Sequence, residues 1–582
     1  MNSLVGGILK RVICIASLFV VVSMTAAAGS EEAKAPDRKS APSEASANSA
    51  AGNQSDINEL KRQLAEQQKQ IEELRAMLQE QAKLIGYTNA SAGARTQPPA
   101  SAGSRVVGEV ASMTPMIPSA AASGPPPVLP QAPKKEEAPE AAPLQLKIGS
   151  AYLTPVGFMD FTAAIRDTAP GSGIGTNFGS IPYRTPTSTT GNLSEFRLSP
   201  QNSRLGMRID TSVKGARVIG YWESDFLGGL GNPPTGNVSV SSNPYAFRLR
   251  LFWVDVRKDK FELLGGQTWS LMTPGRKGIS PLPGDLFFTQ DVDVNYQLGL
   301  VWGRIPEFRG VYHPNEKLTM ALALDNPEQY IGGSGGGGVT TLPANLATPY
   351  AAQVNNGTTV LNVPNMHPDI IAKVAFDSTF ADNHALHIEF GGMERTFKVY
   401  NPLTLTHFTA AGWAVQANLN VEVVKGFRLV TNNYWSHGGG RYIFGQSPDL
   451  VVRNDGSLSL VHSGSTVSGF EYTHKNLLLY TYYGGTYIQR NAISAPGNGG
   501  LVGYGFTGSA NSQNRSSQEG TFGLTNTFWR DPKYGALQFM AQYSYFMRNP
   551  WYVASGAPKG THMNEIFLNL RYALPGAPPS PK

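Results

Sequence analysis

The C-terminal part of the chain is built on a strict two-residue alternation of apolar and polar side chains. Ile566, Leu568 and Leu570 fall on one side of this pattern, and Glu565 and Asn569 fall on the other. Alternate side chains of a β-strand point to opposite faces of the sheet, so the pattern predicts a strand with one apolar face. The alternation recurs from about residue 155 to the end of the chain, between turns rich in Gly, Asn and Pro.

The same alternation predicts further strands in several segments. The expected apolar faces are Leu205/Met207/Ile209, Val218/Gly220/Trp222, Phe247/Leu249/Leu251/Trp253, Leu318/Met320/Leu322/Leu324, Ile370/Ala372/Val374/Phe376, Trp413/Val415/Ala417/Leu419 and Leu537/Phe539/Ala541/Tyr543/Tyr545. Charged residues fall on the opposite faces. The segment 477–483 is ambiguous, because both of its faces are apolar or aromatic.

Residues 1–28 are expected to be a secretory signal peptide. Lys10 and Arg11 precede an apolar stretch, and small residues at 26–28 form the expected cleavage site. The stretch is short for a spanning helix, although a retained single anchor is the alternative. The one cysteine, Cys14, lies inside this segment. We therefore expect a mature chain without disulfides or cysteine chemistry.

Export and strand pattern together predict a transmembrane barrel. Beyond residue 28 we find no apolar run long enough for a membrane helix. The chain nevertheless carries 26 Phe, 23 Tyr, 8 Trp and 63 Gly, with only 15% charged residues. In lipid a closed sheet satisfies every backbone hydrogen bond. The predicted fold class is all-β, an antiparallel transmembrane β-barrel of about sixteen to eighteen strands, with an N-terminal α-helical coiled coil.

The expected domain order follows composition. A disordered segment at 29–55 is rich in Ala, Ser, Glu and Lys. A coiled coil at 56–86 is followed by a Pro/Ala-rich linker at 87–143, which should be extended and semi-rigid. The outer-membrane barrel is expected at 144–574, with a C-terminal tail at 575–582.

The coiled-coil prediction rests on a heptad repeat with apolar a positions and alternating Leu and Gln at d. Its expected oligomerisation residues are Ile57, Leu60, Leu64, Gln67, Ile71, Leu74, Leu78, Gln81 and Ile85. Glutamine at d costs stability but restricts register and strand number, which suits a parallel homo-oligomer. The heptads do not distinguish a dimer from a trimer. A single helix lying on another domain is the alternative.

Arginines gather on the polar faces of strands that should be neighbours in a barrel meander. The predicted pore-lining residues are Arg197, Arg204, Arg208, Arg217, Arg248 and Arg250. Guanidinium groups on one wall attract anions and can bind a carboxylate with two hydrogen bonds. The alternative is that Asp210, Glu223 and Asp225 neutralise them in a wall network. Both can hold together, because arginines outnumber these acids.

A long segment between residues 274 and 295 interrupts the strand pattern, and a loop of this length is usually functional. If it folds inward it should narrow the channel, with Asp285, Asp291 and Asp293 opposite the arginines. Such opposed charges create a transverse field. The alternative is an outward loop with solvated carboxylates.

Enzyme motifs are not evident in the sequence. It contains no nucleophile elbow, zinc-protease helix motif or phosphate-binding glycine loop. His384 and His387 are three residues apart, which in a strand places them on opposite faces, so a surface pair is favoured over a metal site. We therefore predict no enzymatic activity, no cofactor and no metal, and no nucleic-acid partner.

Several short motifs resemble those of the DcaP-like porins of Gram-negative outer membranes. The motifs are NSRLG at 202–206, FRLR at 247–250 leading to GQTWS at 266–270, PDIIAK at 368–373 and GRYI at 440–443. The resemblance covers roughly residues 150–574. It implies a sixteen-stranded barrel, a trimer, a periplasmic coiled coil and passive uptake of small anions, often dicarboxylates. One departure is that ten residues, Ala573 to Lys582, follow Tyr572, whereas outer-membrane barrels usually end on an aromatic residue.

The leading hypothesis from the sequence is an outer-membrane porin for passive diffusion of small hydrophilic, anionic solutes. Its expected partners are outer-membrane lipid and further copies of itself. The alternative is a structural anchor whose periplasmic coiled coil tethers the envelope. The sequence does not identify the solute.

Overall fold

The computed structural model describes residues 145–228, 246–281, 287–290, 296–333, 337–357, 365–381, 383–494 and 500–575. The predicted signal peptide, disordered segment, coiled coil and linker, and all but the first residue of the predicted tail, lie outside these residues. No helix among the described residues is long and apolar enough to cross a membrane.

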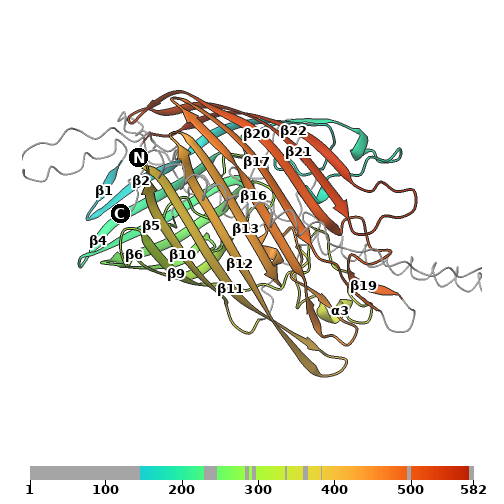
Figure 1. Cartoon of the computed structure of the whole chain (residues 1–582). Helices are drawn as coiled ribbons and strands as arrows, with labels where there is room; N and C mark the ends of the chain where they lie inside the picture. The colour runs from blue at the N-terminus through green and yellow to red at the C-terminus, as the bar shows by residue number, and fades with distance from the viewer. Residues whose placement is uncertain are drawn as a thin grey trace, which may run out of the picture. The chain divides into compact units, whose positions relative to one another are not determined.

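Sixteen antiparallel strands close into a ring (Figure 1). In order around the ring they are β2 (Ala151–Arg166), β4 (Arg204–Val213), β5 (Ala216–Gly228), β6 (Ala246–Lys258), β7 (Phe261–Trp269), β8 (Arg304–Tyr312), β9 (Leu318–Asp325), β10 (Asp369–Phe380), β11 (His384–Asn401), β12 (Thr406–Val424), β13 (Phe427–His437), β16 (His462–His474), β17 (Leu477–Ile488), β20 (Asn514–Asp531), β21 (Gly535–Pro550) and β22 (Thr561–Ala573). The predicted all-β closed barrel is thereby confirmed, with a strand number inside the predicted range.

The ring closes where the last strand meets the first. β22 pairs with the second half of β2, from Phe158 opposite Ala573 to Arg166 opposite Glu565. Two short strands complete the edges of β2: β1 (Leu146–Ile148) continues the side occupied by β22, and β3 (Glu195–Ser199) continues the side occupied by β4. No edge of β2 is therefore left with a long run of unpaired backbone groups.

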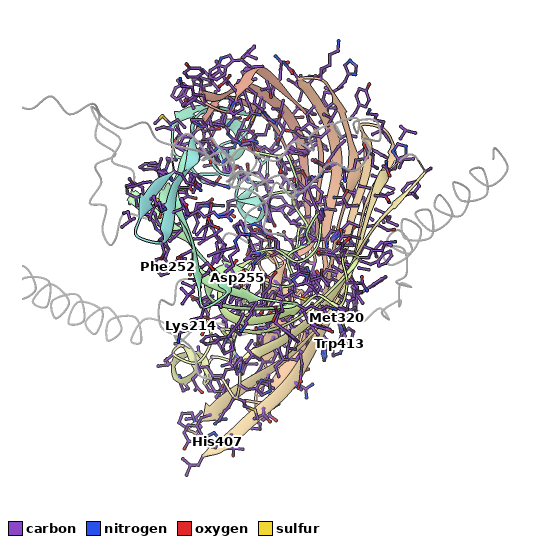
Figure 2. All side chains as sticks on the ribbon, turned by 90° about the vertical axis from the view of Figure 1, so that its left-hand side faces the viewer. Lys214, Phe252, Asp255, Met320, His407 and Trp413 are labelled. Carbon is purple, nitrogen blue, oxygen red and sulfur yellow. The ribbon has the colours of Figure 1, made fainter. Side chains whose placement is uncertain are left out.

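The two ends of the ring differ. At one end the connections are short, for example residues 214–215 between β4 and β5. Lys214 and Gly215 both have positive φ, which is the two-residue hairpin turn that matches strand twist. At the other end the connections are long, except that β11 and β12 extend together as a hairpin with His407 near its tip (Figures 1 and 2).

The long connections carry small elements of their own. These are η1 (Phe178–Ser180), η2 (Thr190–Asn192), α3 (Ala347–Tyr350), η3 (Gly440–Tyr442), the hairpin β14 (Leu450–Val452) with β15 (Leu458–Leu460), and the hairpin β18 (Asn491–Ser494) with β19 (Leu501–Tyr504).

The two faces of the ring follow the alternation expected from the sequence. On β22 the buried side chains include Glu565, Asn569 and Arg571, while Ile566 and Leu570 are exposed on the outside. β17, ambiguous in the sequence, directs Tyr480 and Tyr482 inward and Tyr483 outward. Other outward apolar residues include Phe161, Leu263, Phe308, Leu322, Phe390, Val415, Phe522 and Leu568. Exposed apolar patches on water-soluble proteins rarely exceed roughly a few hundred Å², so this surface requires an apolar surrounding.

One strand departs from its predicted parity. Leu251 and Trp253 of β6 were expected on the apolar outer face, but both are buried inside the ring, and Phe252 is 59% exposed instead. A β-bulge opposite Glu223 and Ser224 shifts the register of β6 by one residue, which reverses the faces beyond it. Phe252 and the inward Asp255 therefore lie on opposite faces of β6 (Figure 2).

We predict that the ion pairs at the closure of the ring stabilise the whole barrel. Buried Arg166 on β2 pairs with Glu565 on β22 and, at 2.6 Å, with Glu195 on β3. Replacing Arg166 by Leu leaves buried carboxylates without their cation, which typically costs about 3–5 kcal/mol. Urea unfolding in lipid vesicles, followed by heat-modifiable gel mobility, should show this loss.

The control for this prediction is the half-exposed pair of Arg184 and Asp167, at 2.5 Å. Solvent-exposed pairs contribute about 0–1 kcal/mol, so Arg184→Leu should unfold close to the parent. Equal effects of the two substitutions would contradict a special role for the closure.

Candidate functional site

The predicted pore-lining arginines come from neighbouring strands of the ring. Arg197 lies on β3, Arg204 and Arg208 on β4, Arg217 on β5, and Arg248 and Arg250 on β6. All six lie on the face opposite the outward apolar side chains. The pairing of β4 with β5 and of β5 with β6 brings these strands side by side, so the arginines share one wall, here called the arginine wall.

The part of the arginine wall nearer the short turn between β4 and β5 is held by one aspartate. Buried Arg208 binds Asp210 through two nitrogen atoms, at 2.6 and 2.8 Å. Arg217, which is 37% exposed, binds the same carboxylate at 3.0 Å. Asp210 therefore serves a buried and a partly exposed arginine at once.

The part of the arginine wall nearer the long-loop end repeats this arrangement. Arg250 is fully buried and binds Glu223 at 2.6 Å and Asp225 at 2.7 Å. Arg248 is 32% exposed and binds Asp225 at 2.5 Å. Arg204 lies 3.9 Å from Glu223. These contacts are the wall network that the sequence left as an alternative.

The wall keeps more cations than anions. Arg197, the most exposed of the six, pairs with Glu195 at 3.1 Å. Six arginines thus meet four carboxylates, Glu195, Asp210, Glu223 and Asp225. Glu195 also binds Arg166. The six arginines therefore outnumber these carboxylates, and Arg197, Arg217 and Arg248 are the three that remain partly exposed.

The connection between β7 and β8, residues 270–303, is here called the crossing loop, and its described residues (270–281, 287–290 and 296–303) contact inward side chains of the ring. Its first described part is held by inward carboxylates of β10, β11 and β16. The amide of Gly275 donates to Glu389 at 3.1 Å, and the amide of Gly278 donates to Asp377 at 2.9 Å. Arg276 makes two hydrogen bonds to Glu471, at 2.6 and 2.8 Å.

The next part of the crossing loop reaches strands that lie half-way round the ring from β7. Phe287 packs edge-on against Tyr482, with ring centroids 4.9 Å apart, and Phe288 packs on Tyr480. The amide of Gln290 donates to the side chain of Gln542 on β21 at 2.8 Å. The loop therefore spans the interior instead of folding outward.

The crossing loop is also linked indirectly to the arginine wall. Arg571 on β22 donates to the side chain of Gln290 at 3.2 Å and binds Asp160 on β2 at 2.7 Å. The guanidinium groups of Arg571 and Arg204 both lie over the ring of Phe158. These contacts link the loop to the wall through one aromatic ring.

The last described part of the crossing loop, from residue 296, is held by a carboxylate and lies close to the backbone of β16. The amide of Leu298 donates to Glu519 at 2.9 Å. Gly299 has positive φ, and a Cβ atom there would lie 2.5 Å from the carbonyl oxygen of Thr466. Such an approach admits only glycine. The predicted constriction residues Asp285, Asp291 and Asp293 lie outside the described residues.

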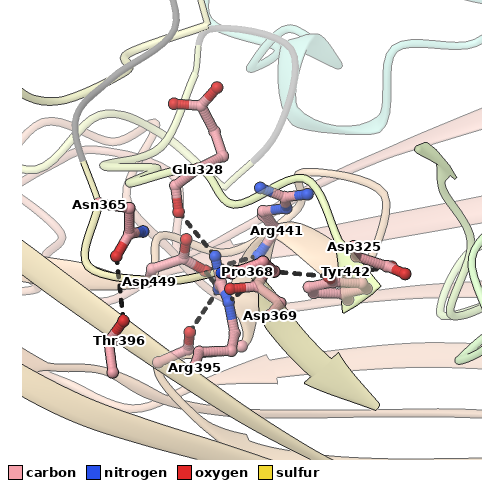
Figure 3. A network of polar contacts seen from close by, with 12 residues as sticks. Asp325, Glu328, Asn365, Pro368, Asp369, Arg395, Thr396, Arg441, Tyr442 and Asp449 are labelled. Atoms are coloured by element: carbon pink, nitrogen blue, oxygen red, sulfur yellow. Dashed lines mark hydrogen bonds and ion pairs between the residues drawn. The ribbon is translucent and has the colours of Figure 1, made fainter. Parts of the chain in front are cut away.

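A second polar network joins the loop between β13 and β16 to strands β10 and β11 (Figure 3). Buried Arg395 on β11 binds Asp369 at 3.0 Å and Asp449 at 2.9 Å. The hydroxyl of Tyr442 in η3 donates to Asp369 at 2.9 Å. Burial raises the pKa of Asp449, against the opposing charge of Arg395, so this carboxylate depends on its partners for stabilisation.

η3 also receives the end of the crossing loop, because the amide of Trp302 donates to the carbonyl of Tyr442 at 2.9 Å. Tyr442 and Ser270, the first residue of the crossing loop, both donate to the carboxylate of Asp325. Both ends of the crossing loop are thus joined to this second network.

The expectation of a surface histidine pair is wrong for His387. Its side chain is buried inside the ring, 2.9 Å from Asp377 and 3.2 Å from Glu389. Its strand face is the inward one, as the parity of β11 requires, and the crossing loop covers it. Among the described residues no group of His, Asp or Glu side chains has the arrangement of a metal site.

The sequence did not indicate the anchors of the crossing loop. No sequence motif connects Arg276 with Glu389 and Glu471, and their spacing does not predict that they meet. The one usable signal was inward parity, which Glu389 and Glu471 both have on their strands. The predicted oligomerisation residues of the 56–86 segment lie outside the part of the chain that the structure describes.

Comparisons with known proteins agree with this geometry. No protein-family model matches the sequence, and no curated protein matches it either. Among solved structures, the outer membrane channel DcaP of Acinetobacter baumannii is 15% identical, with a TM-score of 0.51, over 74% of this chain and 99% of that one. An anion-selective porin from Comamonas acidovorans is 12% identical, with a TM-score of 0.41, over 73% of this chain and 100% of that one. The similarity to DcaP shows that the chain has the fold of an outer-membrane channel.

Proposed function

We propose that this protein is an outer-membrane porin through which small hydrophilic solutes diffuse passively, with a preference for anions. The observation that carries the proposal is a closed barrel that is apolar outside and is crossed inside by an anchored loop beside an arginine-rich wall. The apolar outside suits lipid, and the short connections suit the periplasmic side of such a barrel. The crossing loop would be the constriction.

The anion preference rests on the arginine wall. Buried arginines are matched by carboxylates, so the field available to a solute comes mainly from the partly exposed Arg197, Arg217 and Arg248. Guanidinium groups on adjacent strands would bind the two ends of a small dicarboxylate. We further propose that the chain assembles as a trimer, with its N-terminal coiled coil in the periplasm.

We predict that neutralising Arg217 and Arg248 together to Gln lowers the anion-to-cation permeability ratio without unfolding the barrel. Each is the second arginine on its aspartate: Asp210 keeps Arg208, and Asp225 keeps Arg250. Reversal potentials in planar bilayers under a salt gradient measure the ratio. The difference in permeability ratio between the parent and the double variant should shrink at high salt, because the Debye length falls to about 3 Å at 1 M.

The matched control is Arg530→Gln, an exposed position beside the short turn between β20 and β21, on a strand outside the arginine wall. It should leave the reversal potential unchanged. A parent channel that selects cations at low salt, or a double variant with an unmoved reversal potential, would refute the anion proposal. Succinate should enter proteoliposomes faster through the parent than through the double variant. A neutral sugar of similar size should enter at the same rate through both.

We also predict that Arg276→Ala widens the constriction. The change removes two charge-assisted hydrogen bonds to Glu471, and hydrogen bonds to charged groups contribute about 1.5–3 kcal/mol each. The released loop should raise single-channel conductance and open-state noise. Arg453→Ala, at an exposed residue of the β14–β15 connection, is the control. An Arg276 variant with parental conductance and noise would show that the crossing loop does not limit flow.

A further inference from the structure

Two arginines at the long-loop end of the barrel differ from those inside it. Arg490, just after β17, and Arg515, at the start of β20, are both exposed. Among the described residues neither takes part in an ion pair. The inward arginines of the wall, by contrast, all have carboxylate partners.

Both arginines lie beside Trp551. The guanidinium of Arg515 lies over the indole ring at 6.0 Å. A Cβ atom on Gly505 would lie 2.7 Å from Cγ of Trp551 and 3.1 Å from Cγ of Arg490, so these two side chains flank the same glycine. The indole nitrogen donates to the carbonyl of Ile488 at 2.9 Å, which fixes the ring against β17.

The cluster lies at the long-loop rim, beside a residue on the outward face of β17. Trp551 packs edge-on against Tyr487, with centroids 6.3 Å apart. Tyr487 shares the outward parity of Tyr483, which is exposed. Further exposed aromatic residues, Phe522, Tyr543 and Tyr545, lie on the outward faces of β20 and β21, in the middle part of each strand. Aromatic residues collect at the boundary between hydrocarbon and headgroups.

The surrounding sequence supplies positive charge without acids. From Tyr472 to Gln518, and again from Lys533 to Asn564, the chain contains no Asp or Glu. The second stretch adds the exposed Lys559 in the β21–β22 connection. These ranges include the long-loop ends of β17, β20, β21 and β22, and the acid that contacts this end of β22, Asp167, is itself paired with Arg184.

We propose that Arg490 and Arg515, beside Trp551, bind the phosphate group of a lipid headgroup in the outer leaflet. A phosphate offers the acceptor oxygens that a guanidinium binds with two hydrogen bonds. Basic side chains just beyond an aromatic belt are placed to reach headgroups, with their stems along the apolar surface. Its place at the ends of β17, β20 and β21 separates this site from the arginine wall, which lies on β3, β4, β5 and β6.

The inference rests on the proposed outer-membrane location but not on the solute. Full-length protein in detergent is titrated with bis-phosphorylated lipid A and with its dephosphorylated form, and bound lipid is counted by native mass spectrometry. The parent should bind the phosphorylated lipid, and Arg490→Gln with Arg515→Gln should weaken binding about tenfold or more. Arg530→Gln, on the short-turn end of β20, should bind like the parent.

Three outcomes would overturn the site: equal binding of the dephosphorylated lipid, equal binding by the double variant, or displacement of the lipid by millimolar inorganic phosphate. The last would assign the cluster to free anions. In bilayers of phospholipid alone the double variant should keep parental conductance and selectivity. The conductance measurements therefore test the porin proposal, and the lipid titration tests the lipid site separately.

Discussion

The structure depends on the need to satisfy every backbone hydrogen bond inside an apolar surrounding. An open sheet would leave two edges unpaired, so β22 must return to β2. That return is reinforced by charge: Arg166 binds Glu565, and Arg571 binds Asp160, in each case across the seam. Once the ring is closed, each strand has one face in lipid and one face inside. The alternation of side chains follows from that geometry.

Closure also determines what the inside can do. The crossing loop leaves the ring after β7 and is held by carboxylates of β10, β11 and β16 before it meets the aromatic residues of β17. Its described residues are therefore anchored to several strands of the ring. A loop anchored at several walls restricts the interior at constant geometry, which suits passive selection by size and charge.

Charge is distributed differently inside and outside. The buried arginines of the wall are paired with carboxylates, because an unpaired charge away from water is costly. Arg217 shares Asp210 with buried Arg208, and Arg248 shares Asp225 with buried Arg250, so each keeps a carboxylate partner while it remains partly exposed. Arg490 and Arg515 on the rim are exposed to solvent and tolerate having no counter-ion. Burial thus distinguishes arginines enclosed among carboxylates from arginines that remain accessible to solvent.

The sequence by itself determined the fold class, the strand faces and the wall that carries the arginines, because the two-residue period is a local property of each strand. It could not place the bulge in β6 that turns Leu251 and Trp253 inward, since a bulge depends on pairing with β5. Nor could it find the partners of the crossing loop. Arg276 and Glu471 are 195 residues apart, and Arg571 and Asp160 are 411 apart. Only the closed ring brings such residues together, because hydrogen bonding between neighbouring strands sets which side chains meet across the interior.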